Sequence, residues 1–99
     1  MEDKLLELLK WDKPTTRLAL SIQLKISERK VEELVAKLRD RGESVCSNSD
    51  TAGYWLSEGE DLTRTIKELE RRGLVLLERA RKMKDRQLRG QVSIDEALQ

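Results

Sequence analysis

The stretch that decides the fold runs from Ser27 to Gly42 and reads SERKVEELVAKLRDRG. Ser27 is a residue type that caps helix N-termini, and Glu28 adds a negative charge where the helix dipole favours one. Gly42 follows the last turn, where a left-handed residue commonly ends a helix. The apolar residues recur at three- and four-residue spacings, which place them on one helix face; they are Val31, Leu34, Val35 and Leu38. The pattern predicts a helix over residues 28–41.

Two shorter helices are predicted before this one. Residues 3–11 read DKLLELLKW and have a wide apolar face. Pro14 separates them from a second helix over residues 16–23, because proline disfavours helical geometry in the residue before it. A threonine at position 15 or 16 is suited to cap this second helix. Its expected buried residues are Leu18, Ala19, Ile22 and Leu24.

After Gly42 the sequence becomes typical of strands. Residues 43–57 contain the β-prone segment ESVCS, the turn-forming segment SNSDTAG and the apolar return YWLS. Two short strands around a polar loop predict a β-hairpin. We expect Cys46 to be a small buried residue. The three aromatic residues could stack on single-stranded nucleic acid, but packing within the protein is the favoured interpretation for Trp11, Tyr54 and Trp55.

A long helix is predicted over residues 58–89, with Ser57 and Glu60 spaced as in a capping box. Apolar or small residues then alternate four- and three-residue steps, as in a heptad repeat; they are Leu62, Ile66, Leu69, Gly73, Leu76, Ala80 and Met83. One interpretation is a homodimer through these residues, in which the outer, basic face of the helix could meet the backbone of a nucleic acid. The other is that the helix packs back on Leu5, Leu8 and Trp11. Residues 90–99 are interpreted as a flexible tail or a short docking peptide.

The composition of the 99 residues narrows the function classes. There is one Cys and no His, which leaves neither a disulfide framework, nor a zinc site, nor a His-based catalytic triad. We see no nucleophile–base pair, phosphate loop or cofactor motif, and we expect no enzyme activity, no cofactor and no bound metal. The N-terminus carries acids where a signal peptide needs bases, and no apolar run is long enough for a membrane span. We therefore expect a cytoplasmic protein without membrane contact.

The near-equal totals of 20 Lys plus Arg and 19 Asp plus Glu conceal an uneven distribution. Residues 28–41 carry five bases and four acids, and residues 57–70 carry five acids and two bases. Residues 71–89 carry eight bases and two acids. The neutral total therefore does not exclude local contact with nucleic acid.

The whole arrangement resembles a known family. The segment PTTRLALSIQLKISERKVEELVAKLRDRG, followed by a hairpin that returns on GYWL, is similar to small bacterial and prophage winged helix-turn-helix proteins. The resemblance implies a mainly α fold with a small β-hairpin. A winged helix-turn-helix domain would occupy residues 1–57, with its recognition helix at about 28–41 and its wing at about 43–57. It also implies binding to double-stranded DNA, for transcription regulation or for prophage control or replication.

In such folds the N-terminal residues of the capped helix lie at base edges in the major groove. Arginine and lysine there can donate to guanine, and glutamate can accept from cytosine. Hydroxyl and cationic groups at the start of the preceding helix and in the turn suit phosphates. The predicted contacts are Thr15, Thr16, Arg17, Lys25, Ser27, Glu28, Arg29, Lys30, Glu33 and Lys37, with Asn48 and Ser49 in the wing.

Two features favour other interpretations. Alternating Lys, Arg and Glu are also typical of any solvated helix, and the loop of residues 47–53 contains an acid but no base. We therefore expect a modest contribution from the wing. The alternative function is a winged-helix adaptor whose long C-terminal helix recruits a protein partner.

Overall fold

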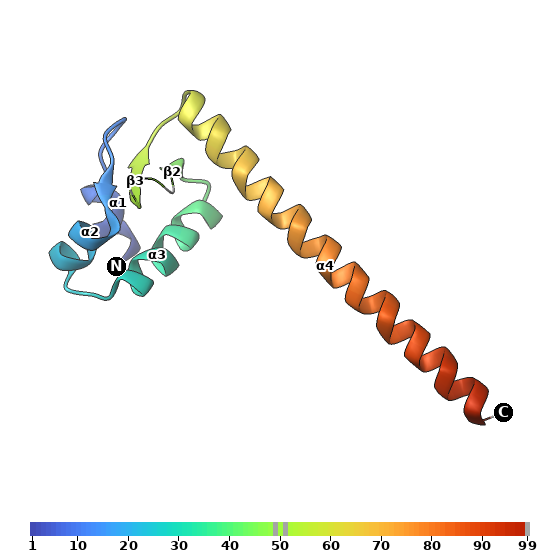
Figure 1. Ribbon diagram of the computed structural model, residues 1–99. Helices are drawn as coiled ribbons and strands as arrows, with labels where there is room; N and C mark the ends of the chain where they lie inside the picture. The colour runs from blue at the N-terminus through green and yellow to red at the C-terminus, as the bar shows by residue number, and fades with distance from the viewer. Residues whose placement is uncertain (49, 51, 99) are drawn as a thin grey trace. The chain divides into compact units, whose positions relative to one another are not determined.

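A computed structural model of the chain describes residues 1–48, 50 and 52–98, with side chains described as far as residue 89. The fold is mainly helical, with a small three-stranded antiparallel sheet and a long C-terminal helix (Figure 1). The chain divides into two units, Met1–Ile66 and Lys67–Gln99. The first unit holds the three short helices and the sheet.

The helix expected over residues 28–41 is α3 (Glu28–Asp40). The Ser27 side chain accepts a hydrogen bond from the backbone N–H of Lys30 at 3.1 Å, as the N-cap prediction requires. Gly42 has a φ of +87°, and its N–H donates to the Arg39 carbonyl at 2.9 Å. The following N–H, of Glu43, donates to the Leu38 carbonyl at 3.0 Å. These two bonds close the C-terminus, so both predicted ends of the helix are confirmed within one residue.

The helix before it is α2 (Arg17–Leu24), and its N-cap is Thr16. The expectation that Leu18 and Ile22 are buried was wrong, because these side chains are 56% and 67% exposed. Leu20 and Ser21 are buried instead. The Ser21 hydroxyl donates to the Leu18 carbonyl at 2.7 Å, which satisfies its polar group inside the domain. Because a serine lies on the inner face, the pattern of apolar residues did not indicate the true orientation of this helix.

The sheet consists of β1 (Thr15–Thr16), β2 (Val45–Ser47) and β3 (Gly53–Leu56), in the order β1-β3-β2. The antiparallel pair β2–β3 is the predicted hairpin. The third strand, β1, was not predicted; it pairs antiparallel with β3 and leads directly into α2. The sheet thereby fixes the point at which α2 begins.

The first helix, α1 (Glu2–Leu8), ends earlier than the predicted 3–11. The chain turns instead, because the Leu56 N–H donates to the Lys10 carbonyl at 2.9 Å and the Asp12 N–H donates to the Leu56 carbonyl at 2.8 Å. This turn leaves Trp11 57% exposed, which contradicts the expectation that it packs inside the protein. Trp55 is buried, as expected, and Tyr54 is partly buried against the core.

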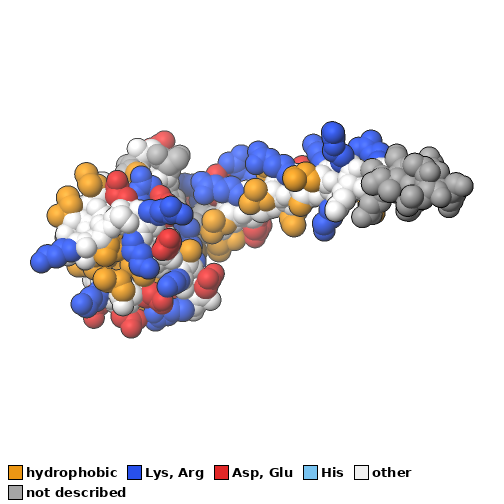
Figure 2. Space-filling model, turned by 90° about the horizontal axis from the view of Figure 1, so that it is seen from below, with side chains coloured by type: hydrophobic (Ala, Val, Ile, Leu, Met, Phe, Trp, Pro, Cys, Tyr) orange, Lys and Arg blue, Asp and Glu red, His pale blue; other side chains and the backbone are white. Residues whose placement is uncertain are grey.

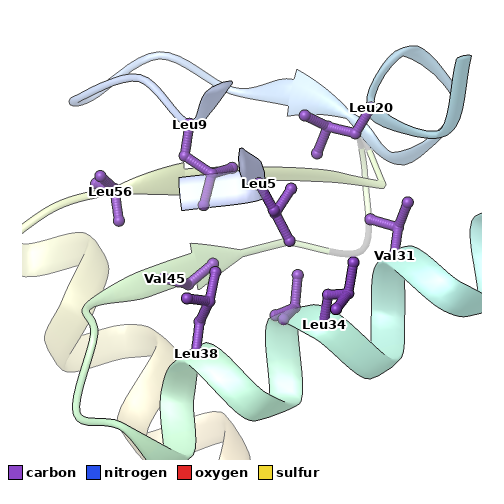
Figure 3. Packing of buried hydrophobic residues seen from close by; sticks show 9 residues of the cluster. Leu5, Leu9, Leu20, Val31, Leu34, Leu38, Val45 and Leu56 are labelled. Carbon is purple, nitrogen blue, oxygen red and sulfur yellow. The ribbon is translucent and has the colours of Figure 1, made fainter. Parts of the chain in front are cut away.

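The core of the first unit is aliphatic. Figure 3 shows side chains of α3 pointing toward those of α1 and β2, which join the helices to the sheet. The cluster contains Leu5, Leu9, Leu20, Val31, Leu34, Val35, Leu38, Val45 and Leu56. Its α3 members are the four residues that the sequence placed on one face. Burial of this face leaves the opposite side of α3 in solvent.

The long helix α4 runs from Glu60 to Leu98. It begins two residues later than predicted, and the Ser57 hydroxyl accepts from the Gly59 N–H at 3.2 Å. The Trp55 indole N–H donates to the Asp61 carboxylate at 3.0 Å, which joins β3 to the first turn of α4. The backbone of α4 continues to Leu98, so the prediction that this helix ends at residue 89 was wrong. The side chains of residues 90–99 lie outside the described residues.

Candidate nucleic-acid interface

The outer side of α3 presents two cations to solvent. Arg29 and Lys37 are exposed, and within the described part of the chain neither makes an ion pair. They lie eight positions apart on the helix, which corresponds to about 12 Å along the axis. Exposed, unpaired guanidinium and ammonium groups are available to phosphates or base edges.

The remaining charges of this side are largely paired. Arg17 of α2 binds Glu28 and Glu32 of α3, with a distance of 3.3 Å from Nε to the Glu28 carboxylate. The hydrogen bond that Arg17 donates to the Glu28 carboxylate raises the pKa of Arg17, and the charge of Glu32 acts in the same direction. Lys30 lies 3.6 Å from Glu33 on α3 itself. Arg17 and Glu28, predicted as separate DNA contacts, are therefore engaged with each other.

The pairing has an electrostatic consequence for this surface. A bare carboxylate on α3 would repel phosphates, and the single positive charge of Arg17 offsets one of the two negative charges of Glu28 and Glu32. The same ion pairs connect the start of α2 to the first turns of α3. Arg17 therefore influences the charge of the candidate interface by pairing with Glu28 and Glu32, in addition to any contact that its own guanidinium makes with a ligand.

The hydroxyl groups at the helix starts already have structural partners. Thr16 accepts from the Ala19 N–H at 3.1 Å, and Ser27 accepts from the Lys30 N–H at 3.1 Å. Each hydroxyl proton is a separate donor and can still be given to a phosphate oxygen. Thr15 lies in β1, where it pairs with Tyr54. The predicted contacts 15–17 therefore lie at one junction of sheet and helix.

Lys25 occupies the turn between α2 and α3 and has a left-handed backbone, with φ of 57° and ψ of 44°. The Lys25 N–H donates to the Ile22 carbonyl at 3.2 Å, and the Ile26 N–H donates to the Ser21 carbonyl at 3.0 Å. These bonds end α2 and allow α3 to begin within three residues. The Lys25 side chain is exposed. It adds a third cation close to the start of α3.

The hairpin loop is joined to the start of α2. The Ala52 carbonyl accepts from the Arg17 N–H at 2.9 Å. Asn48 is exposed, whereas Ser49 lies outside the described residues. At the base of the hairpin, Arg39 of α3 donates from Nε to the Val45 carbonyl at 3.0 Å, and its guanidinium also donates to the Ser47 hydroxyl at 3.0 Å.

The sequence pattern did not reveal this role of Arg39, which was counted only among the five bases of residues 28–41. Its guanidinium holds β2 against α3 through one backbone and one side-chain acceptor. A planar group with several donors is well suited to such a double contact. Arg39 therefore fixes the position of the hairpin relative to the exposed side of α3.

A hollow of about 530 Å³ lies elsewhere on the first unit. Exposed Trp11 forms part of its wall, and the other lining residues are acidic or small: Asp12, Ser57, Glu58, Gly59, Glu60 and Asp61. The negative charge of this wall is unfavourable for phosphate.

In the described residues no three acidic or Cys side chains are grouped so as to hold a metal ion. Among the described residues, no helix has both the length and the apolar character needed to cross a membrane.

Comparisons of the chain with protein-family models, with curated proteins and with solved structures gave no match.

Proposed function

We propose that the first unit is a winged helix-turn-helix domain that binds double-stranded DNA through α3. The observation that carries the proposal is the order of elements, α1-β1-α2-α3-β2-β3, with the strands in the order β1-β3-β2. In this arrangement a short turn at Lys25 connects two helices, and a hairpin follows the second one. The capped second helix would enter the major groove, and the hairpin would be the wing.

The charges of the domain support α3 as the reading element. Arg29 and Lys37 are exposed on it, and Lys25 lies in the turn that precedes it. The four apolar residues of α3 are used by the core, which frees its other side for a ligand. The wing has no base among residues 47–53. It would contribute hydrogen bonds from Asn48 without the counterion release that cations provide.

The test is selection of bound duplexes from a random-sequence library by the full chain, followed by fluorescence anisotropy with the selected duplex and a scrambled one. We expect tighter binding of the selected duplex. Affinity equal for both duplexes, at the non-specific level of roughly 10⁻⁴–10⁻⁶ M at physiological salt, would refute the proposal.

Matched variants locate the binding surface. Arg29→Gln should weaken binding and relax the preference at one base pair, with a cost of about 1–3 kcal/mol if the contact is bidentate. Lys37→Gln should weaken binding to all duplexes and reduce the salt dependence. The control is Lys13→Gln, which removes an exposed cation in the turn that follows α1. An equal loss in the control variant would show a general charge effect and contradict the assignment to α3.

A further inference from the structure

The second unit carries an apolar stripe without a partner in the described chain. It consists of Leu69, Gly73, Leu76, Ala80 and Met83, at alternating four- and three-residue steps, and we call it the α4 stripe. Leu69, Leu76 and Met83 are 40%, 61% and 72% exposed. In Figure 2, apolar side chains lie along one side of this helix and Lys and Arg side chains along another. Isolated helices gain little stability in water unless such a face is covered.

We propose that a second copy of this chain covers the α4 stripe, and that the two helices run antiparallel. Leu76 of each copy would lie on Gly73 of the other, and Leu69 on Ala80. The steps of the stripe allow this arrangement, because the spacing from residue 69 to 80 is the same when read in either direction. The proposal concerns α4 alone and does not depend on DNA binding by the first unit.

The sizes of the side chains favour the antiparallel arrangement. Large residues alternate with small ones along the stripe, with Leu69 and Leu76 large and Gly73 and Ala80 small. A parallel pair in register would place glycine against glycine and alanine against alanine, which leaves unfilled space between leucine layers. An antiparallel pair places a leucine against a small residue in each of these layers. The volumes are then evenly distributed along the interface.

The space beside Gly73 is open, as close packing of a second helix on this position requires. A Cβ atom added at this position would meet nothing within 4 Å. Packing within α4 therefore gives no reason for glycine in the helix interior, where it costs about 1 kcal/mol relative to alanine. A leucine from a second helix, packed closely on the backbone, supplies such a reason.

Charge supplies an independent argument for the direction. Residues 79–89 carry six bases and one acid, whereas residues 67–78 carry three bases and three acids. In a parallel pair the two basic segments would lie side by side and repel. In an antiparallel pair they lie at opposite ends. The unequal distribution of charge along α4 therefore disfavours the parallel dimer and leaves the antiparallel one without a large penalty.

The first experiment measures association of the full chain by sedimentation equilibrium. Leu76→Asn should dissociate the dimer, with the dissociation constant raised at least tenfold. The control is Leu74→Asn, because Leu74 is 62% exposed, similar to Leu76, but lies off the stripe. It carries the same substitution and the same loss of helix propensity, and we expect a dimer. A monomeric parent chain at 100 µM, or equal dissociation by both variants, would overturn the proposal.

A second variant distinguishes loss of the dimer contact from loss of helical structure as the cause of dissociation. Gly73→Ala raises helix propensity, so α4 should become more helical by circular dichroism. The added methyl group should nevertheless weaken the dimer, because it occupies the space assigned to Leu76 of the second copy. A Gly73→Ala chain that dimerises more tightly than the parent would contradict the proposed contact.

Disulfide trapping tests the direction of the helices. Leu69→Cys chains mixed with Ala80→Cys chains should form a mixed disulfide, whereas Ala80→Cys chains alone should not. In the antiparallel pair the two Ala80 positions are about 16 Å apart along the axis, beyond the 7 Å limit for Cα atoms of a disulfide. The parent protein is the control, because its Cys46 is buried. Efficient crosslinking of Ala80→Cys chains with one another would establish a parallel pair and overturn the proposal.

Discussion

The turn residue Lys25 allows the stability of the domain to be separated from its proposed function. It has a left-handed backbone, with φ of 57° and ψ of 44°, and an exposed cationic side chain. The left-handed region costs a residue with a Cβ atom about 1–2 kcal/mol, whereas glycine adopts it freely. Glycine in turn loses more backbone entropy on folding, by about 0.5–1 kcal/mol. Lys25→Gly should therefore stabilise the folded state by about 0.5–1 kcal/mol.

The matched variant is Lys25→Ala, which removes the same charge and keeps the Cβ atom. The difference between the glycine and alanine variants isolates the backbone term, because both lack the lysine side chain. For a domain of this size, 1 kcal/mol corresponds to about 4–8 °C in Tm. Urea and thermal unfolding of the full chain, followed by circular dichroism, measure the difference. A glycine variant no more stable than the alanine variant would refute the assignment of strain to Lys25.

The same two variants should behave alike toward DNA. If Lys25 neutralises one phosphate, both lower the slope of log affinity against log salt by about 0.9. Lys25→Arg should keep the slope. Glycine would then give a more stable but weaker-binding protein, because it removes the strain and the cation together. Unchanged affinity in both variants would contradict the contact from this turn while leaving the stability result intact.

Three further predictions concern the first unit. Asp61→Ala should destabilise it by about 1–3 kcal/mol in urea unfolding, because the indole N–H of buried Trp55 loses its acceptor; a neutral result would show that another acceptor is available. Ser27→Ala should cost about 1 kcal/mol through loss of the α3 N-cap, whereas Ser27→Asp should keep the cap and weaken DNA binding, as paired unfolding and anisotropy measurements can check. Burial raises the pKa of the Cys46 thiol, so a thiol reagent should modify the native chain slowly and the urea-unfolded chain rapidly near pH 8; equal rates in the two states would contradict its burial.

Periodicity predicted the elements whose stability comes from their own apolar face. In α3 the four buried residues, the serine cap and the terminal glycine agree, and the helix was located within one residue. In α2 the prediction of the buried face was wrong, because Ser21 lies on the inner side and Ile22 on the outer side. Such an arrangement depends on a local hydrogen bond from the Ser21 hydroxyl. A pattern based on apolarity gives no sign of it.

Contacts between elements distant in the sequence were not predictable in the same way. The two-residue strand β1 has no periodicity, and it forms because Thr15 lies opposite Tyr54. The ion pairs of Arg17 join residues 11 and 15 positions apart, and they depend on how α2 crosses α3. The early end of α1 similarly results from hydrogen bonds between Leu56 and residues 10–12. The tertiary fold is therefore needed to tell which charges of the candidate interface are paired and which are not.

Because few cations of the candidate interface are unpaired, the salt dependence of the proposed DNA binding would report how many phosphates they contact. If Lys25 and Lys37 each neutralise one phosphate while Arg29 contacts a base, one domain gives a slope of about −2 in log affinity against log salt. Two domains held by paired α4 helices on one duplex would give about −4. Anisotropy titrations between 50 and 300 mM salt, on the parent chain and on the dissociated Leu76→Asn variant, distinguish the two values. A slope near zero would contradict the phosphate contacts of Lys25 and Lys37, and a parent slope far steeper than about −4 would indicate that the basic residues 79–89 also contact the DNA.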